Sequence, residues 1–446
     1  MTVNYSQNGY GKAGINFTLR SLGAPAARGQ EGSLNRVMNK AISFEEYREL
    51  NGRVQFIGFT QRFEDVIKTF NVPEGETPAG FRIECYLESE GVLTVDLVRD
   101  ISYDKDGLKR PTKMVFSADS ANPYEIAPIS ALLGNLTCNP GIVYDLFINN
   151  PKANVGNKFE TLEEVMTEIG RILGPGCDIS VELNNPFEKD FNKIIDECEK
   201  FKAILTEYRL VVKVPHMGPV NGENVSELLT GDKKFSKRYD QPLTEDAFRS
   251  HNLALKLREH GYRINYTLMF EPHQTALALQ AKPAFINTFV RHRLMQSEKM
   301  RNLLAFYDIS KDKKHLEDLR TLMLSADMLS KNEAEKDLVD VKRFAEDTLI
   351  YRHFDDKEGG DGLDMARHNL RMLKLNNLPD TRLIICSMEG PLNYPDIDKL
   401  VTDPEFADVI DRLVITAEPG YLARFSSANQ VVSYQRRFMN AVQGAK

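Results

Sequence analysis

No stretch of the sequence approaches the roughly 20 consecutive apolar residues that a membrane-spanning helix needs. The first fourteen residues also hold no apolar segment of the kind found in signal peptides. Only five cysteines are present, they are dispersed, and none forms a CxxC pair. Such a set indicates reduced thiols rather than a disulfide framework or a zinc finger. We therefore expect a cytoplasmic protein without a membrane partner.

Metal and nucleic-acid signatures are absent as well. The eight histidines form no HExxH motif and no ligand cluster, so the sequence predicts no metal site and no cofactor. The formal net charge of −7 argues against a broad nucleic-acid surface. With 42% hydrophobic and 27% charged residues among 446, the composition is typical of a globular protein and excludes a mostly disordered chain.

Residues 1–110 predict an N-terminal extension that is partly β-structure and carries no recognisable chemistry. Residues 1–40 are rich in Gly, Ser, Asn and Gln, and we expect a flexible arm or a surface strap there. Ser43-Phe44-Glu45-Glu46 has the form of a helix capping box. Among the strand-like runs that follow, 81–87 and 92–98 flank a predicted hairpin turn.

From residue 111 to residue 446, short apolar runs alternate with amphipathic helical stretches. Runs that are apolar on both faces and separated by helices are what a parallel sheet covered by helices requires. Eight such units predict an α/β fold, a closed (β/α)8 TIM barrel. A doubly wound sheet is the alternative, but no GxGxxG follows a first strand. The predicted strands are 114–120, 135–140, 178–183, 209–215, 264–270, 284–290, 382–388 and 412–418.

The connection between the sixth and seventh predicted strands is unusually long. It predicts a helical insertion over about residues 294–380, with two amphipathic helices inside it. One helix would place Leu316, Leu319 and Met323 on a single stripe, and the other would follow near 338–349. Connections of this length in a compact domain carry a lid, an interface or an added subdomain.

Polar residues occur at the ends of the predicted strands, where the catalytic groups of barrels lie. Lys213 stands in an apolar strand, where a charged lysine must pair or lose its proton. A lysine with a depressed pKa forms Schiff bases with carbonyls. A lysine that forms an ion pair with Glu182 would instead have a structural role. Lys213 by itself does not distinguish the catalytic role from the structural one. Glu182 and Thr267 could activate or relay a water molecule, and Asp119 could accept the proton of a substrate hydroxyl while a carbon–carbon bond breaks. The asparagines that could bind sugar hydroxyls, or be ordinary buried amides, are Asn139, Asn265 and Asn287.

The chain from about residue 114 to 425 resembles the transaldolase family of Schiff-base aldolases. Six segments carry this resemblance, in family order and on the predicted strands. They are Ala118-Asp119-Ser120-Ala121-Asn122, Leu136-Thr137-Cys138-Asn139-Pro140, Ser180-Val181-Glu182, Val212-Lys213-Val214-Pro215, Asn265-Tyr266-Thr267-Leu268-Met269-Phe270 with Gln274 and Ala276, and Ile286-Asn287-Thr288-Phe289-Val290.

The resemblance implies a role for each matched residue. Lys213 would attack a ketose carbonyl, and Glu182 and Thr267 would hold the catalytic water. Asp119 would be the general acid/base for cleavage of the bond between carbons 3 and 4. A dihydroxyacetone-type enamine would then wait on Lys213 for an acceptor aldehyde, with no metal or cofactor. The residues that would hold it are Asn139 and Asn265. Relatives form homodimers or larger rings, so a homo-oligomer is expected too.

The departures from the family bear on the substrate. Phe289 stands where the branch that releases free dihydroxyacetone carries Tyr, which favours transfer. The family arginine after the sixth strand aligns with His292, although either neighbour could serve. After Ser387, the family's next arginine is replaced by Glu389, which would repel a phosphate. We therefore expect a non-standard sugar, unphosphorylated or differently decorated. The expected substrate-binding residues are Asn139, Asn265, Asn287, Phe289, Ser387, Arg291, His292 and Arg293.

Three functions remain open from the sequence. The first is a transaldolase-like transferase that moves a ketol unit from a ketose to an aldehyde through a lysine Schiff base. The second keeps the Schiff base but is an aldolase or isomerase. The third is a catalytically retired barrel that binds a sugar or a partner protein, because fold and motif do not by themselves fix function.

Overall fold

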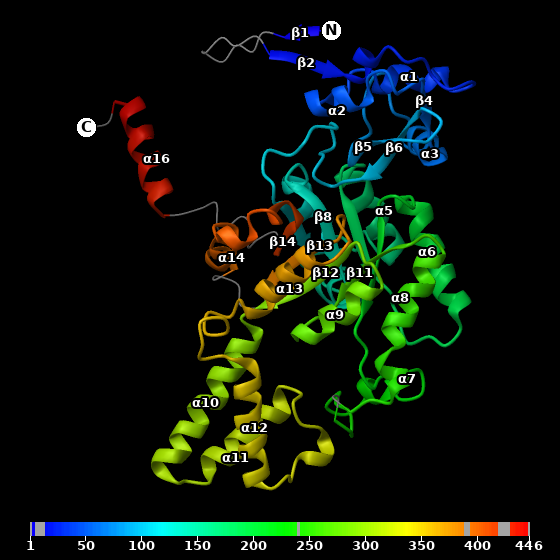
Figure 1. Ribbon diagram of the computed structural model, residues 1–446. Helices are drawn as coiled ribbons and strands as arrows, with labels where there is room; N and C mark the ends of the chain where they lie inside the picture. Colours follow the sequence, from blue (N-terminus) through cyan, green and yellow to red (C-terminus); the bar gives the residue numbers. More distant parts are fainter. Residues whose placement is uncertain (1, 5–13, 239–240, 388–392, 418–428, 445–446) are drawn as a thin grey trace. The chain divides into compact units, whose positions relative to one another are not determined.

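The computed structural model (Figure 1) describes residues 2–4, 14–238, 241–387, 393–417 and 429–444. The chain divides into two compact units. The first comprises Met1–Pro111 with Leu173–Asp178, and the second comprises Thr112–Ile172 with Ile179–Lys446. Among the described residues, no helix combines the length and the apolar character that crossing a membrane requires.

The first unit contains two three-stranded sheets, ordered β1-β2-β3 and β4-β6-β5. The predicted hairpin is confirmed, because β5 and β6 pair antiparallel around Gly91, whose φ of 78° suits glycine. The capping box is confirmed too: the Glu46 amide donates to the Ser43 hydroxyl at 3.1 Å, at the start of α2. The elements are β1 (Thr2–Asn4), β2 (Gly14–Thr18), η1 (Leu19–Leu22), α1 (Glu31–Val37), β3 (Ala41–Ile42), α2 (Phe44–Leu50), β4 (Phe56–Phe59), α3 (Gln61–Thr69), β5 (Phe81–Leu87) and β6 (Val92–Arg99).

Residues 14–40 are the described part of the range for which a flexible arm or a surface strap was expected. Residues 14–40 contain β2, η1 and α1. Leu19 and Val37 are buried there, and the burial of apolar side chains is what holds such a segment in place. A Gly- and Ser-rich composition was therefore a poor guide to order in this segment.

The second unit is built on a closed, all-parallel barrel, as the sequence predicted. Its strands follow one another around the barrel in chain order, from β7 to β14, and β14 pairs with β7 to close it. The doubly wound alternative is therefore wrong. Each strand begins within two residues of the start of a predicted run. The starts could be predicted because strands that are buried on both faces stand out as apolar runs. The strands are β7 (Val115–Asp119), β8 (Leu133–Cys138), β9 (Asp178–Glu182), β10 (Leu210–Pro215), β11 (Arg263–Thr267), β12 (Phe285–Val290), β13 (Arg382–Ser387) and β14 (Leu413–Ala417).

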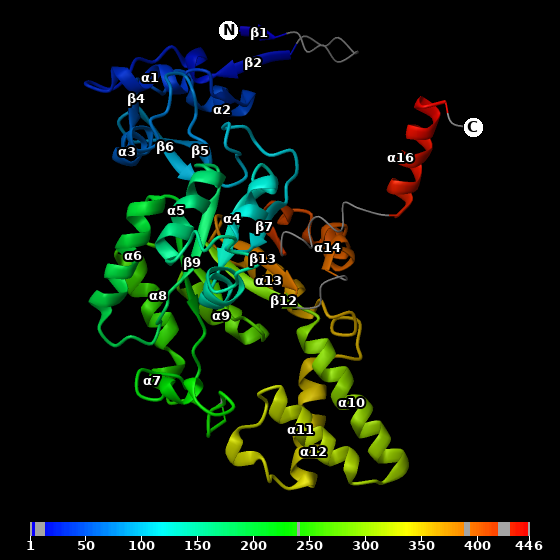
Figure 2. The same cartoon turned by 180° about the vertical axis from the view of Figure 1, so that it is seen from behind.

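Helices surround these strands (Figure 1 and Figure 2). Those of the barrel region are α4 (Pro123–Ile126), η2 (Ala127–Ile129), the π-helix η3 (Gly141–Ile148), α5 (Leu162–Leu173), α6 (Phe191–Leu205), η4 (Val225–Leu229), α7 (Thr244–Ala247), α8 (Arg249–Glu259), α9 (Pro272–Gln280), α13 (Asp364–Leu375), α14 (Asn393–Val401), η7 (Pro404–Phe406) and η8 (Ile410–Arg412). A further helix, α16 (Asn429–Val442), has no buried residue.

The insertion between β12 and β13 contains one more helix than the sequence analysis identified. Its elements are α10 (His292–Ser310), α11 (Lys314–Ser325), η5 (Lys331–Glu333) and α12 (Leu338–Arg352). The three α-helices lie side by side in both views (Figure 1 and Figure 2) and share a core that includes Leu319, Met323 and Val341. Because α13 packs against β12, β13 and α9, it belongs to the barrel, so the insertion is shorter than the predicted 294–380.

The two ends of the insertion meet. The backbone amide of Arg291, just after β12, donates to the carbonyl of Gly362, just before α13, at 2.9 Å. Gly362 has a φ of 78°, and a Cβ there would come within 2.9 Å of the Arg291 Cα. Glycine is therefore required at this close approach.

We predict that the core of the insertion can be loosened without loosening the barrel. Leu319→Ala removes a side chain with 0% exposure, which should cost about 2–5 kcal/mol of local stability. Amide hydrogen exchange should accelerate across α10–α12 and stay unchanged in the barrel strands. Leu375→Ala, at a leucine that is 82% exposed, is the matched control. Equal protection in both variants would contradict the prediction.

Candidate active site

Lys213 and Glu182 form a buried ion pair on neighbouring strands of the barrel. Parallel pairing of β10 with β9 sets Lys213 directly opposite Glu182. Lys213 Nζ lies 3.2 Å from Glu182 Oε2, and the two side chains are only 5% and 15% exposed. Lys213 Nζ also donates to the carbonyl of Cys138 at 3.1 Å. The lysine is thus paired, which is one of the two outcomes expected for a charged lysine in an apolar strand.

The charged groups at the strand ends shift one another's pKa values. Burial alone would lower the pKa of Lys213, but the nearby carboxylates Glu182 and Asp119 outweigh burial and leave the pKa of Lys213 above its ordinary value. Burial also raises the pKa of Asp119, against the opposing effects of Lys213 and Thr137. Lys213 therefore rests as an ammonium, and Asp119 holds its proton more tightly than an exposed aspartate.

Asp119 is held by the neighbouring strand. β7 pairs with β8 so that Asp119 lies opposite Thr137, and the Thr137 hydroxyl donates to Asp119 Oδ1 at 2.9 Å. Side chains two residues apart on a strand share a face, so Asn135 lies below Thr137. Asn135 donates to Ser117 at 3.0 Å, and these residues form a polar layer inside the barrel. Thr137 was not among the predicted site residues, although its place on that face is the signal that could have found it.

Asn265 is the least satisfied polar side chain near Lys213. It lies opposite Lys213 in the pairing of β10 with β11 and has 0% exposure. Neither its amide nitrogen nor its amide oxygen has a hydrogen-bond partner within the described part of the chain. An unsatisfied buried polar group costs about 1–3 kcal/mol, so a ligand or a water that pairs with this amide would be favoured.

Thr267 and Asn287 are brought together on β11 and β12. Asn287 Nδ2 donates to the Thr267 hydroxyl at 3.1 Å, and Asn287 Oδ1 has no partner among the described residues. Because the Thr267 oxygen accepts from Asn287, its own hydroxyl proton is left to donate elsewhere. Asn139 is used differently, since its Oδ1 accepts from the Ile142 amide at 2.9 Å, at the start of η3. The amide nitrogen of Asn139 and the second lone pair of its oxygen are therefore left for a substrate.

The three basic residues after β12 are all engaged in contacts within the protein. Arg291 binds Asp396 of α14 through two nitrogens. Arg293 Nε lies 3.1 Å from Glu271, and its NH1 also binds Asp364. A guanidinium that is paired with buried carboxylates has little charge left for a substrate phosphate.

His292 belongs to an aromatic stack. Phe270 and Phe289 stack with ring centroids 4.7 Å apart and planes 13° apart, and the centroid of the His292 ring lies 4.9 Å from that of Phe270. Burial, and next the positive charge of Arg352, lower the pKa of His292. His292 is thus a neutral member of an aromatic wall rather than a cation. Phe270 was missed by the sequence analysis as a site residue.

Two residues of the predicted site are placed only in part. The backbone of Ser387 ends β13 and pairs with Val290 of β12, but its side chain lies outside the described residues. Glu389 also lies outside them. Cys386, one residue before Ser387, feels the charges of Asp119 and Lys213, and burial, the largest cause, raises the pKa of its thiol. A neutral thiol at this position does not compete with Lys213 for a carbonyl.

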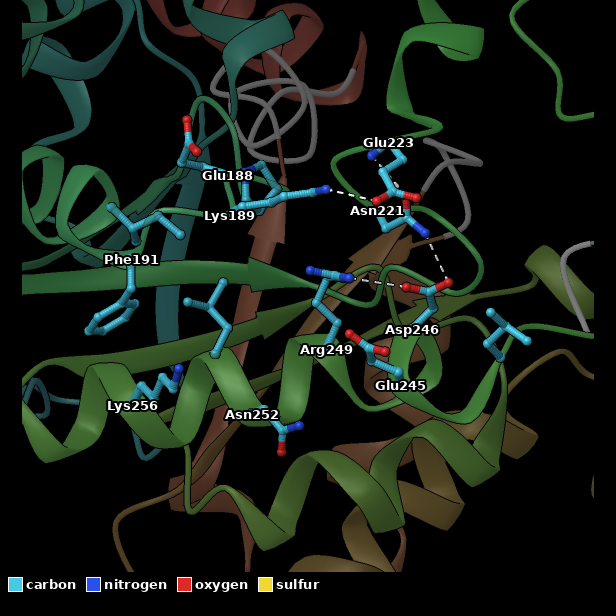
Figure 3. Close-up of a pocket in the computed structure, with 14 residues that line it drawn as sticks. Glu188, Lys189, Phe191, Asn221, Glu223, Glu245, Asp246, Arg249, Asn252 and Lys256 are labelled. Atoms are coloured by element: carbon cyan, nitrogen blue, oxygen red, sulfur yellow. Dashed lines mark hydrogen bonds and ion pairs between the residues drawn. The ribbon is translucent and has the colours of Figure 1, made fainter.

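A further groove is lined by other residues (Figure 3). It has a volume of about 510 Å³ and is lined by residues of α6, α7 and α8 and of the loops near them. Asp246 connects two parts of its lining, because it accepts a hydrogen bond from Asn221 at 3.0 Å and forms an ion pair with Arg249 at 3.1 Å. The groove contains none of the predicted site residues, and its charges are mixed.

No protein-family model matches this chain, and no curated protein matches it. The transaldolase resemblance therefore depends on the six sequence segments, and we carry it forward as a proposal.

We predict that Asp119 lowers stability increasingly as pH rises. The unfolded chain releases this proton near the ordinary value of 3.8, whereas the folded chain holds it to higher pH. Stability is therefore lost as pH rises from 3.8 through the folded pKa of Asp119. Asp119→Asn cannot ionise and keeps an oxygen that accepts from Thr137, so its Tm advantage over the unmodified protein should grow across that window.

Thermal unfolding between acidic and neutral pH measures this difference. Asp145→Asn, at an exposed aspartate, is the control and should show no such trend. A Tm difference for Asp119→Asn that shrinks with rising pH would contradict the prediction.

Proposed function

We propose that this protein is a transaldolase-like, Schiff-base transferase. It would move a dihydroxyacetone-type ketol unit from a ketose donor to an aldehyde acceptor, without a metal or an organic cofactor. The observation that carries the proposal is that a second carboxyl group, Asp119, lies close enough to the Lys213–Glu182 pair to act on the Lys213 pKa, which a merely structural ion pair would not require. A nucleophilic amine, a proton carrier 3.2 Å away and a second carboxyl group are the groups that imine chemistry needs.

The first step is imine formation. Lys213 rests as an ammonium, so it must first pass a proton to Glu182, its nearest carboxylate. The neutral amine then attacks the ketose carbonyl to give a carbinolamine, and the departing hydroxyl takes a proton to leave as water. Thr267, whose hydroxyl proton is free to donate because Asn287 occupies its oxygen, would hold that water with Glu182.

The second step is carbon–carbon cleavage. Asp119 would accept the proton of the hydroxyl on carbon 4, and the electron pair of the carbon 3–carbon 4 bond would flow into the protonated imine. The products are a free aldehyde and an enamine on Lys213. Addition of this enamine to another aldehyde reverses the sequence, and Asp119 returns its proton to the new alkoxide. The raised pKa of Asp119 suits both directions, because an acid/base works best near the operating pH.

Phe289 favours transfer over release of the three-carbon unit. Its ring stacks on Phe270 and carries no hydroxyl, so it cannot donate a proton to the enamine. An apolar wall at this place also keeps water from the intermediate. The enamine would therefore persist until an acceptor aldehyde arrives.

The donor that we propose is a neutral sugar. Arg291 and Arg293 are engaged by Asp396, Glu271 and Asp364, and a paired cation attracts a phosphate weakly. We also propose that the reaction takes place in the cytoplasm, since all five cysteines are free thiols.

The proposal predicts a covalent adduct on Lys213. Incubation with a panel of ketoses, followed by borohydride, should convert the imine to a stable amine. Intact mass would give the retained unit, and peptide mass spectrometry would place it on Lys213. Lys213→Met should give no adduct. Lys189→Met, at a lysine that is 58% exposed and paired with Glu223, should give the adduct at the original rate. An adduct that persists in Lys213→Met would refute the proposal.

The proposal also predicts a preference for unphosphorylated donors. A ketose and its phosphate ester, compared at equal concentration, should form the adduct faster in the neutral form. Asp396→Asn releases Arg291 from its carboxylate partner and should shift the preference toward the phosphate ester. If the ester is the better donor in the unmodified protein, the substrate assignment is wrong, although the Schiff base would stand.

A further inference from the structure

The loop that joins β11 to α9 begins directly after Thr267, carries Phe270 and has an unfavourable backbone. Leu268 has a φ of 56°, a left-handed conformation that costs energy for a residue with a large side chain. Gln274 holds the loop from the α9 side: its Oε1 accepts from the amides of Phe270 at 2.6 Å and Glu271 at 2.8 Å. A strained loop of this kind persists only where its surroundings determine its shape.

The helical insertion holds the same loop from the other side. Arg352, the last residue of α12, donates through NH2 to Glu271 Oε1 at 2.6 Å. Arg293, in the first turn of α10, lies 3.1 Å from Glu271 Oε2 and also binds Asp364. We call these four residues, Glu271, Arg293, Arg352 and Asp364, the Glu271 clamp.

The Glu271 clamp is electrically balanced and partly open to solvent: the side chains of Glu271 and Asp364 are 22% and 15% exposed, and Arg293, Arg352 and Asp364 line a cavity. Its two guanidinium groups face two carboxylates, and Arg293 and Arg352 are only 6% and 7% exposed. Arg352 NH1 also donates to Gln296 Oε1 at 2.7 Å, which ties the end of α12 to α10. Exposed ion pairs contribute little to structure, but removing one partner of a buried set leaves a charge without compensation.

The chain itself and two side-chain contacts connect the clamp with the barrel. Glu271 is followed inward by Phe270, whose ring stacks on Phe289 of β12. Thr267, at the end of β11, lies three residues before Phe270 and binds Asn287 of β12. The position of Glu271 thus constrains both the hydroxyl and the aromatic wall that the proposed chemistry uses.

We propose that Glu271 and Arg352 are positioning residues for the Schiff-base reaction. Through the Glu271 clamp, the insertion fixes the loop from Thr267 to Glu271 in the conformation in which the Thr267 hydroxyl and the Phe270 ring serve the imine. Neither residue is among the proposed substrate-binding groups. This inference rests on the proposed function, because it assigns the clamp to the same site.

The test combines turnover with hydrogen exchange in the full-length protein. The donor is the ketose that gives the Lys213 adduct. In Arg352→Gln, amides of residues 264–275 should exchange faster, and kcat should fall about tenfold to hundredfold, as expected for a displaced catalytic group. KM should change by less than about threefold, since uniform binding is retained. Arg352→Lys keeps the charge and should recover part of kcat.

A double-mutant cycle separates positioning from general stability. Glu271→Gln should lower kcat by a similar factor, and the double variant should be no worse than the worse single variant, because both changes break one contact. Arg343→Gln is the matched control: it lies on the same helix, and its pair with Asp340 is exposed. It should leave both exchange and kcat unchanged.

Three outcomes would overturn the inference. The first is an unchanged kcat in Arg352→Gln together with normal or faster exchange in the loop. The second is a fall in kcat that Arg343→Gln reproduces. The third is multiplicative losses in the double variant. Absence of any Lys213 adduct in the unmodified protein is a different result, which refutes the proposed function and removes this inference with it.

Discussion

The buried contact between Lys213 and Glu182 constrains the rest of the barrel. An ammonium that is taken out of water without a partner is too costly for a folded protein to retain, so the carboxylate must lie on the adjacent strand at the same level. That level is set by the parallel register of β9 and β10. A slip of one residue would turn every side chain of a strand to its opposite face. Barrel closure and the proposed chemistry therefore require the same register.

The interior of the barrel is more polar than stability alone would select. Asn265 is buried with an unsatisfied amide, and desolvation raises the pKa of Asp119, so that its charged form is disfavoured. Apolar residues of similar volume would pack at these positions without a desolvation cost. Groups kept at such a cost are concentrated at functional sites, which is why a binding role alone explains them less well than a reaction that moves protons.

The barrel could be predicted from the sequence because each strand is buried on both faces and is therefore visible as a short apolar run. The neighbours Glu182, Lys213 and Asn265 could be predicted as well, since consecutive strands of a barrel lie side by side. The partners of Arg291 and Arg293 could not. Asp396 lies 105 residues after Arg291, and no local pattern indicates such a pairing.

The helix α10 was missed for a related physical reason. Its buried residues serve two surroundings, since Arg293 joins the Glu271 clamp while Met300 and Leu304 enter the core of the insertion. No single apolar stripe marks such a helix. Glu271 was likewise inconspicuous, because acidic side chains are common at the N-terminal end of a helix.

The hydrogen bond between Arg291 and Gly362 has a consequence for how the chain folds. The segment between these two residues is therefore a loop whose ends are in contact. The entropy of closing such a loop grows only with the logarithm of its length, so a long loop burdens the pairing of β12 with β13 little more than a short one. The helices of this loop contact one another over short sequence distances, which favours rapid local folding. Strand pairing and helix assembly can then proceed independently of each other.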